Sequence, residues 1–234
     1  MENRNSQKDL EFDALQVCAG LDGTMQERGA TADTWLAQPV PEMSYAGRLR
    51  RSEWEVRPIS IEAARPFIEI EHYAAGASNT ATILHGLFRR GDIFDNQCKG
   101  IAWWIPPTKS AALATYPANW RGVLALSRLA IEPGVPKNAC TFLQARSIKM
   151  IDRVQWPCLV TYADEWRGHT GTIYRASGWE YMGLTKPERT YVTSDGRMVA
   201  RKAGPKTRTH AEMLALGATC VGSFAKHKFR KVAA

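Results

Sequence analysis

The segment Trp156–Thr185 constrains the fold of this chain more than any other. Residues 156–162 form a short apolar run typical of a buried strand. Residues 168–177 suit a short helix, and Gly178 is the glycine expected directly after a helix end. Residues 179–184 alternate large apolar and polar side chains, as a half-buried strand does. A strand, a helix and a second strand in so short a stretch predict a compact βαβ unit, and hence an α/β fold.

Other patterns extend this unit into one domain. Strands are predicted at 54–58, 83–89, 99–105 and 123–131, and a hairpin at 190–202. Helices are predicted from Ser60 to about Tyr73 or Ala75, at 137–154 and at 209–216. We expect residues 1–50 to be a partly mobile extension, residues 51–204 to form the catalytic domain, and residues 205–234 to form a basic C-terminal helix and tail.

The composition is that of a globular protein, with 44% hydrophobic and 23% charged residues. No apolar run approaches the roughly 20 residues that cross a bilayer, and the first dozen residues are polar and charged. We therefore expect a cytoplasmic protein that does not bind membranes. Its five cysteines are scattered and never form a C-x-x-C pair, which argues against a zinc ribbon or a redox motif.

The net charge of +8 predicts an anionic partner. Beyond residue 186, Lys and Arg strongly outnumber Asp and Glu. The segment 226–231, KHKFRK, interleaves cations with a histidine and a phenylalanine, a pattern that can neutralise phosphates and stack on bases. The alternative is a charged end that only increases solubility. We predict nucleic-acid contacts for the cations of this segment, namely Lys226, Lys228, Arg230 and Lys231.

One pattern within the central segment resembles a known superfamily. Gly171, Ile173, Tyr174, Gly178 and Trp179 stand as G-x-I-Y-x-x-x-G-W, which resembles the C-terminal half of the GCN5-related N-acetyltransferase (GNAT) fold. The resemblance implies a GNAT-like N-acyltransferase fold, with a central mixed sheet of splayed parallel strands flanked by helices. It also implies that Tyr174 donates a proton to the leaving group. The alternative is that Tyr174 is a helix aromatic packed under the sheet.

The loop 132–139, EPGVPKNA, departs from the GNAT pattern. In that superfamily a glycine-rich turn at a helix N-terminus cradles the pyrophosphate of coenzyme A with backbone N–H groups. Here Gly134 is the single glycine, and the two prolines of the loop lack N–H donors. This departure argues against ordinary acetyl-CoA as the donor. Arg128, Lys137 and Asn138 remain candidates for holding an anionic group of a different donor.

Two longer blocks resemble a narrower family. LSRLAIEPGVPKNACTFL and TYADEWRGHTGTIYRASGW, together with the His72–Tyr73 pair after the first predicted helix, resemble the Mom family of phage DNA-modification proteins over about 53–232. The resemblance implies a transferase that converts adenine in DNA to its N6-carbamoylmethyl (acetamido) derivative. Such a modification shields phage DNA from restriction enzymes in the cytoplasm of the bacterial host.

The resemblance, together with residue chemistry, indicates which side chains carry the reaction. Asp164 follows a predicted strand, where it could act as general base or orient His72. These two residues, with Tyr73, could also hold Fe²⁺. The donor is not defined by the sequence: a glycyl donor and a metal-assisted rearrangement are both open. The predicted catalytic residues are His72, Tyr73, Ser127, Ser147, Asp164 and Tyr174.

The implied substrate adds two requirements. The N6 amine of adenine is a weak nucleophile, and the base must be reached in a transiently single strand or flipped from double-stranded DNA. Trp103 and Trp104 could line a slot for the base or could instead seal an edge of the core. A two-fold homodimer would suit duplex DNA. Two alternatives stay open: an ordinary GNAT acetyltransferase acting on a protein or small amine, and a non-catalytic DNA-binding module.

Overall fold

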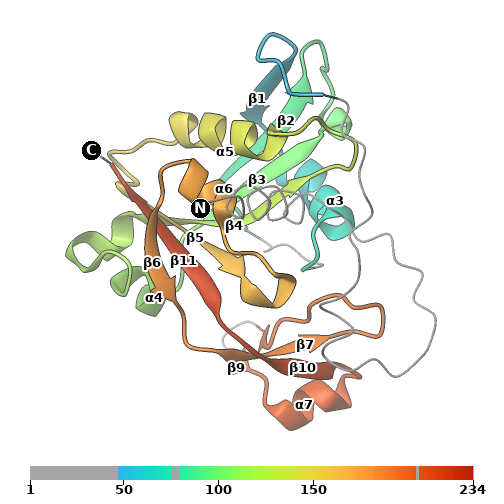
Figure 1. The fold of residues 1–234 in the computed structure, drawn as a ribbon, viewed down its shortest axis with the longest axis vertical. Helices are drawn as coiled ribbons and strands as arrows, with labels where there is room; N and C mark the ends of the chain where they lie inside the picture. Colours follow the sequence, from blue (N-terminus) through green and yellow to red (C-terminus); the bar gives the residue numbers. More distant parts are fainter. Residues whose placement is uncertain (1–46, 75–79, 204–205, 234) are drawn as a thin grey trace, which may run out of the picture.

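The computed structural model describes residues 47–74, 80–203 and 206–233 (Figure 1). The predicted N-terminal extension lies outside these ranges except for its last four residues. Of these four, Leu49 is buried, and its backbone N–H donates to the carbonyl of Lys137 (3.4 Å). None of the helices within the described ranges is long and apolar enough to cross a membrane.

The centre of the molecule is a seven-stranded mixed sheet with the order β1-β2-β3-β4-β5-β11-β6. Only β4 and β5 pair in parallel, and every other neighbouring pair is antiparallel. A mixed sheet with one parallel pair and flanking helices confirms the predicted fold class. The strands are β1 Trp54–Pro58, β2 Ile83–Arg89, β3 Gly100–Ile105, β4 Val123–Ile131, β5 Cys158–Asp164, β6 Glu180–Leu184 and β11 Lys226–Val232.

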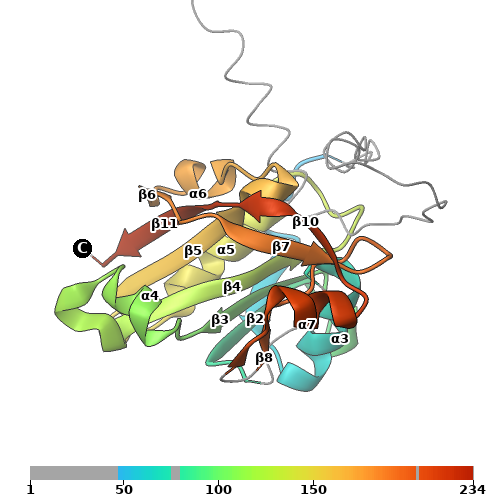
Figure 2. The ribbon, with the colours of Figure 1, turned by 90° about the horizontal axis from the view of Figure 1, so that it is seen from below.

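Helices cover both faces of this sheet (Figures 1 and 2). On one face, α3 (Ile61–Glu71) packs in an apolar cluster with Trp103, and α4 (Lys109–Leu113) packs in another with β4 and β5. On the other face, α5 (Ala139–Met150) and α6 (Thr172–Ala176) share a cluster with Trp104. Successive side chains of a strand point to opposite faces, so the two tryptophans belong to different layers of the core.

Helix α5 is shorter at both ends than the predicted helix 137–154. Asn138 has a left-handed backbone (φ 68°), so the helix can begin only after it. At the other end, the Asp152 carboxylate accepts the N–H groups of Val154 and Gln155, at 2.8 and 3.3 Å. This side-chain turn replaces the helical hydrogen bonds there, because Asp competes well for local backbone donors.

The parallel pair β4–β5 is joined over only half of its length. Residues 123–126 pair with 158–161, whereas β4 continues to Ile131 and β5 to Asp164 without further pairing to each other. The strands therefore splay apart from Leu126 onward. This gap, which the resemblance implied, positions the candidate site described below.

A second unit is inserted between β6 and β11. Residues 185–225, called the insertion from here on, form a small sheet of β7 (Glu188–Val192) and β10 (Thr219–Phe224) with helix α7 (His210–Ala215). Figure 1 shows this unit beyond one end of the main sheet. The turn of the hairpin predicted at 190–202 is confirmed, because the backbone N–H of Thr193 donates to the carbonyl of Arg197 across it. The structure also shows the Thr209–Glu212 capping box at the start of α7. Two short strands complete the insertion, β8 Lys202–Ala203 and β9 Lys206–Thr207.

Three short 3-10 helices lie outside the insertion: η1 Asp95–Gln97, η2 Pro117–Gly122 and η3 Glu165–Arg167.

The predicted basic tail is instead strand β11. It lies between β5 and β6 and is hydrogen-bonded to both, and Phe229 at its centre is fully buried. The prediction of a separate C-terminal tail within 205–234 is therefore wrong. For the same reason β5 and β6 are not neighbours, and the predicted compact βαβ unit is split by a strand that comes later in the chain.

Candidate functional site

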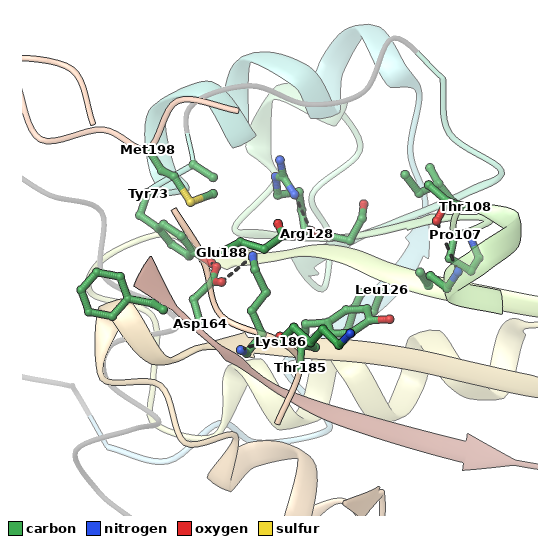
Figure 3. Close-up of a pocket in the computed structure, with 18 residues that line it drawn as sticks. Tyr73, Pro107, Thr108, Leu126, Arg128, Asp164, Thr185, Lys186, Glu188 and Met198 are labelled. Atoms are coloured by element: carbon green, nitrogen blue, oxygen red, sulfur yellow. Dashed lines mark hydrogen bonds and ion pairs between the residues drawn. The ribbon is translucent and has the colours of Figure 1, made fainter. Parts of the chain in front are cut away.

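A cleft of about 470 Å³ opens where β4 and β5 separate, on the face covered by α3 and α4 (Figure 3). Its floor comes from the main sheet and its walls from the end of α3, the start of α4 and the insertion. Figure 3 shows Thr108 and Pro107 on the opposite side of the cleft from Tyr73 and Met198. The residues that matter most below are Tyr73, Thr108, Leu126, Ser127, Arg128, Tyr162, Asp164, Lys186, Glu188, Met198, Phe224 and Lys226.

A β-bulge explains why Ser127 and Arg128 interrupt the apolar strand β4. Trp103 pairs with Arg128 and Trp104 pairs with Leu126, so Ser127 is an extra residue in the ladder. The Ser127 hydroxyl donates to the carbonyl of Trp103 (3.2 Å), and the Arg128 guanidinium donates to the carbonyl of Ser127 (2.7 Å). A bulge bends its strand and redirects side chains, and here both polar side chains line the cleft.

Asp164 is the polar centre of the cleft. It ends β5, is buried, and is in register with Lys226 at the start of β11. The Tyr73 hydroxyl donates to one carboxylate oxygen, and the Lys226 ammonium lies 2.5 Å from the other. The three side chains come from separate elements, and Figure 3 shows Tyr73 and Asp164 pointing toward one another. Two sequence-predicted residues, Tyr73 and Asp164, are thus in direct contact, while Lys226 serves as a counter-ion instead of a tail cation.

The environment of Tyr73 keeps both it and His72 uncharged at neutral pH. The His72 ring stacks on Tyr73 (centroids 4.4 Å apart), and the His169 ring meets it edge-on at 5.7 Å. Removal from solvent, followed by the negative charge of Asp164, raises the pKa of Tyr73 well above its usual value. Removal from solvent, followed by the positive charge of Arg128, lowers the pKa of His72 well below its usual value.

A smaller cavity of about 40 Å³ adjoins the cleft. Its lining comes from both faces of the sheet, with Tyr162 from the α4 side and Tyr174 from α6. The gap between β4 and β5 therefore reaches through the sheet towards Tyr174. This tyrosine is buried and packs against Trp179 and Phe229, so its ring is also part of the core. The cavity brings together five of the predicted residues, namely His72, Tyr73, Ser127, Arg128 and Tyr174.

Ser147 does not belong to this site. It is fully buried on the face of α5 that packs on the sheet, with its hydroxyl 2.7 Å from Nδ1 of His85. The indole N–H of Trp104 also donates to that hydroxyl, at 2.7 Å. Ser147 lines neither the cleft nor the smaller cavity. The prediction of a catalytic Ser147 is therefore wrong, because its hydroxyl satisfies two buried polar groups of the core.

Trp103 and Trp104 do not form a slot for a base. Both have no exposed surface, and they lie in apolar clusters on opposite faces of the sheet. Stacking on a nucleobase requires an accessible ring face, so the prediction that they bind nucleic acid is wrong. The alternative, that they seal the core, is confirmed.

Lys137 and Asn138 lie at the start of α5 and line neither the cleft nor the smaller cavity. The Asn138 side chain accepts the N–H of Leu49 (3.0 Å), and Lys137 forms a backbone bridge with Arg48. Of the three predicted donor-binding residues, the structure brings only Arg128 to Asp164 and Tyr73. A donor-binding role for Lys137 and Asn138 stays a prediction.

The other β11 cations have partners inside the protein. The Lys228 ammonium donates to the carbonyl of Ala114, and the Lys231 ammonium donates to those of Ser177 and Gly178. Arg230 donates to the carbonyl of Thr115 and to both oxygens of Glu180. These carbonyls follow the C-terminal ends of α4 and α6, where the helix dipole favours positive charge. These three cations therefore stabilise helix ends and do not belong to a free tail, while their predicted contact with nucleic acid stays a prediction.

The predicted Fe²⁺ site does not fit the arrangement of donors. Both oxygens of Asp164 are engaged, one by the Tyr73 hydroxyl and one by the Lys226 ammonium. His72 Nδ1 accepts the N–H of Ala74 (3.1 Å). Within the described ranges, no group of three or more His, Cys, Asp or Glu side chains is placed to hold a metal ion. The Lys226 ammonium in contact with Asp164 would oppose a divalent metal there, so no metal is assigned to this site.

Several residues of the site escaped the sequence reasoning. His169 is buried beside Tyr73 and lines the smaller cavity, and Lys186, Glu188 and Phe224 reach the cleft from the insertion. A signal for His169 was available, since it lies within the block TYADEWRGHTGTIYRASGW that carries the family resemblance. No local signal places the insertion residues, because their position depends on how β6 and β11 pair.

Comparisons with solved structures give acetyltransferases as similar folds. The ribosomal-protein-S18-alanine N-acetyltransferase of Escherichia coli is 12% identical, with a TM-score of 0.46 and coverage of 76% of this chain and 93% of that one. An N-acetyltransferase from Staphylococcus aureus Mu50 is 10% identical, with a TM-score of 0.45 and coverage of 76% and 98%.

Sequence comparison identifies a narrower relationship. The methylcarbamoylase mom of Escherichia phage Mu is 26% identical over 151 residues, which amount to 62% of this chain. The match spans 58% of the length of that relative. The model of the Mom protein family matches residues 53–232, which include the cleft, the smaller cavity and the insertion. The chain belongs to the Mom protein family.

Proposed function

We propose that this chain is a DNA-modifying transferase that adds a carbamoylmethyl group to the N6 amine of adenine in DNA, protecting that DNA from host restriction. The family and the phage Mu methylcarbamoylase support the reaction class. The observation that carries the proposal is the Tyr73–Asp164–Lys226 cluster that lines the cleft. It supplies an uncharged hydroxyl and a paired carboxylate where a base could enter.

The cleft suits a flat, polar base. Leu126, Met198 and Phe224 supply apolar walls, and the polar groups converge on the floor around Asp164. Ligand sites commonly combine an apolar lining with a few convergent polar groups, and about 300–1,000 Å³ is their usual volume. A cleft of about 470 Å³ therefore has room for an adenine flipped out of the stack.

The Tyr73–Asp164 hydrogen bond is suited to removing the N6 proton. The raised pKa of Tyr73 prevents a free phenolate, so the hydroxyl can act only by passing protons on. We propose that the Tyr73 oxygen accepts the N6 proton while its own proton moves to Asp164. Lys226 stabilises the carboxylate before the transfer and would be released from it afterwards. Such general base catalysis typically contributes about 10²–10⁴ in rate.

The product limits what the donor can be. In a carbamoylmethyl group the new bond joins N6 to a methylene carbon, so transfer of an acetyl group cannot form it. The bond from that methylene carbon to its leaving group breaks, and the leaving group keeps the electron pair. Arg128 lines both cavities and can stabilise negative charge there, while Tyr174 lies where it could supply a proton to the leaving group.

The test is nucleoside mass spectrometry of DNA from bacteria that express the chain. We expect a 2′-deoxyadenosine adduct that carries one carbamoylmethyl group in place of one hydrogen. Tyr73→Phe and Asp164→Asn should lose the adduct, whereas the control Tyr181→Phe should keep it, because Tyr181 is exposed and bonds to His227 outside the cleft.

Other outcomes would favour the alternatives. Unmodified adenine together with newly acetylated protein or amine would support an ordinary acetyltransferase. Salt-sensitive DNA binding without any altered nucleoside would support a non-catalytic DNA-binding module.

A further inference from the structure

The α4–η2 segment carries an exposed basic and aromatic surface beside the cleft. The Lys109 ammonium lies 5.4 Å from the centre of the Trp120 ring, and the Arg121 guanidinium lies 4.7 Å from it. Both cations are exposed, and neither forms a salt bridge within the described ranges. We call these three residues, Lys109, Trp120 and Arg121, the Trp120 patch.

This patch adjoins one wall of the cleft. Pro107, Thr108 and Ala111, which flank Lys109 in the chain, all line that wall. Their wall faces the one formed by Tyr73 and Met198 (Figure 3). Lys186, on the insertion, is a further cleft-lining cation that is exposed and lacks a salt bridge within the part of the chain that the structure describes. Positive charge thus borders the opening from two separate elements.

The position of these cations matches what a flipped base requires. A base that enters the cleft stays attached to its own sugar and phosphates, so the strand on either side must pass over the opening. Phosphates there would meet cations that form no salt bridge with any carboxylate of the described residues. The Trp120 ring, which contacts both cations and is partly buried, also offers its exposed part to a sugar or a neighbouring base.

We propose that the Trp120 patch and Lys186 form the surface that holds the phosphodiester backbone of DNA across the cleft. The inference rests on the proposed function and deepens it, because it specifies which face of the protein carries the polymer. It also reassigns the DNA-binding cations from β11, whose cations have internal partners, to two segments that border the opening.

The molecule contains a matched control surface. Arg51, Arg146 and Lys149 surround a groove of about 310 Å³ along the outer side of α5, and Arg146 lies 5.5 Å from the ring centre of Phe142. This groove has the same number of exposed cations, with one cation–aromatic contact where the Trp120 patch has two. It lies on the layer that covers the opposite face of the sheet and does not border the cleft. The two surfaces thus carry the same number of exposed cations and differ chiefly in their position relative to the cleft.

The experiment compares two triple variants of the full chain. One is Lys109→Ala, Arg121→Ala and Lys186→Ala, and the other is Arg51→Ala, Arg146→Ala and Lys149→Ala. Binding of a fluorescein-labelled DNA duplex is measured by anisotropy over a series of salt concentrations, and the adenine adduct is quantified on the same duplex. The six side chains are exposed, so we expect both variants to unfold at the temperature of the wild type, and the single variant Lys186→Ala repeats the test with less perturbation.

We expect the cleft-side variant to bind at least about tenfold more weakly, and the slope of log K against log salt to shrink by about one for each cation removed. The α5 variant should bind and modify DNA nearly as the wild type does. Equal losses from the two variants would overturn the inference, since net charge alone would then explain binding. A wild type that modifies adenine, with an unimpaired cleft-side variant, would overturn the inference and leave the proposed function intact. A wild type that neither binds nor modifies DNA would overturn both.

Discussion

Two polar clusters lie close to opposite faces of the same sheet, and both contain residues that sequence reasoning assigned to catalysis. In the cleft, the Tyr73 hydroxyl donates to Asp164, which also pairs with Lys226. Under α5, the Ser147 hydroxyl contacts His85 and receives the indole N–H of Trp104. Each cluster centres on a hydroxyl in a short hydrogen-bonded network. The first lines the cleft of about 470 Å³, whereas Ser147 and His85 line neither that cleft nor the smaller cavity beside it.

The difference between the clusters is charge and access. The buried cluster carries no formal charge, since burial lowers the pKa of His85 to about 4 and leaves it neutral at pH 7. The cleft cluster instead holds the Asp164–Lys226 ion pair, which lines an open cleft. A hydroxyl beside a histidine is therefore a poor indicator of chemistry unless substrate can reach it and charge can change there.

The largest expected effect comes from a substitution that disrupts the cleft cluster. Asp164→Asn keeps the shape of the side chain but removes the acceptor for the proton of Tyr73, so kcat/KM for adenine modification should fall by at least about 100-fold. The rate of adduct formation, followed by mass spectrometry on a defined duplex, measures it. The control is Asp152→Asn, which alters a carboxylate in the turn after α5, away from the cleft. Retention of full activity by Asp164→Asn would remove Asp164 from the mechanism.

Breaking the buried cluster should affect stability instead. Ser147→Ala leaves the N–H of Trp104 and the ring nitrogen of His85 without their partner, which should lower the free energy of unfolding by about 2 kcal/mol. Activity per folded molecule should stay near that of the wild type. Urea unfolding, combined with active-site titration below the transition, separates the two quantities. A large loss of kcat with unchanged stability would return Ser147 to the catalytic set.

Local patterns were enough to predict most of the sheet. Strand β4 was predicted at its observed bounds, because Val123–Ile131 is a long apolar run between turn signals. The capping box of α7 was likewise readable, since Thr209 and Glu212 have the required spacing. Strand β11 was missed although the side chains of 226–231 alternate between the two faces of the sheet, with Lys226, Lys228 and Arg230 on one face. Its cations suggested a solvated tail, and the helix ends that neutralise them are visible only in three dimensions.

Site residues were predicted correctly where their position in the chain sequence places them at the site. They were predicted wrongly where their position depends on how the strands and helices pack. Asp164 could be assigned because it ends a strand, where functional groups of α/β proteins collect. Ser147 could have been excluded, since it lies four residues after Leu143 and seven after Cys140, on the same buried face of α5. Trp103 and Trp104 were ambiguous because neighbouring strand residues face opposite sides, and here both sides are core.

The pH dependence of the free energy of unfolding tests whether His85, in the buried cluster, is neutral in the folded protein. Its folded-state pKa of about 4 lies below the ordinary value of 6.5, so below pH 6.5 the unfolded chain binds a proton that the folded chain does not. Stability should therefore fall as pH drops from 6.5 towards 4, by about 1 kcal/mol between pH 7 and 5.5 from this residue. His72 acts in the same direction, so the comparison is with His85→Gln, whose urea midpoint should change less over that range. Parallel curves for the two proteins would contradict a neutral, buried His85.

The smallest expected effect concerns the cations of β11, of which one pairs with Asp164 in the cleft and another stabilises a helix end. Lys226 pairs with Asp164 in the cleft, whereas Lys231 donates to the carbonyls of Ser177 and Gly178 after α6. Lys231→Met keeps the aliphatic stem and removes the charge at the helix end, so the free energy of unfolding should fall by about 0.3–1 kcal/mol without loss of activity. Lys226→Met should reduce adduct formation, because Asp164 loses the positive charge with which it pairs in the cleft. Thermal unfolding and adduct rates on both variants measure the contrast. If both variants lost activity equally, the charge of the whole strand would matter more than its contact with Asp164, and the cleft cluster would no longer differ from the rest of β11.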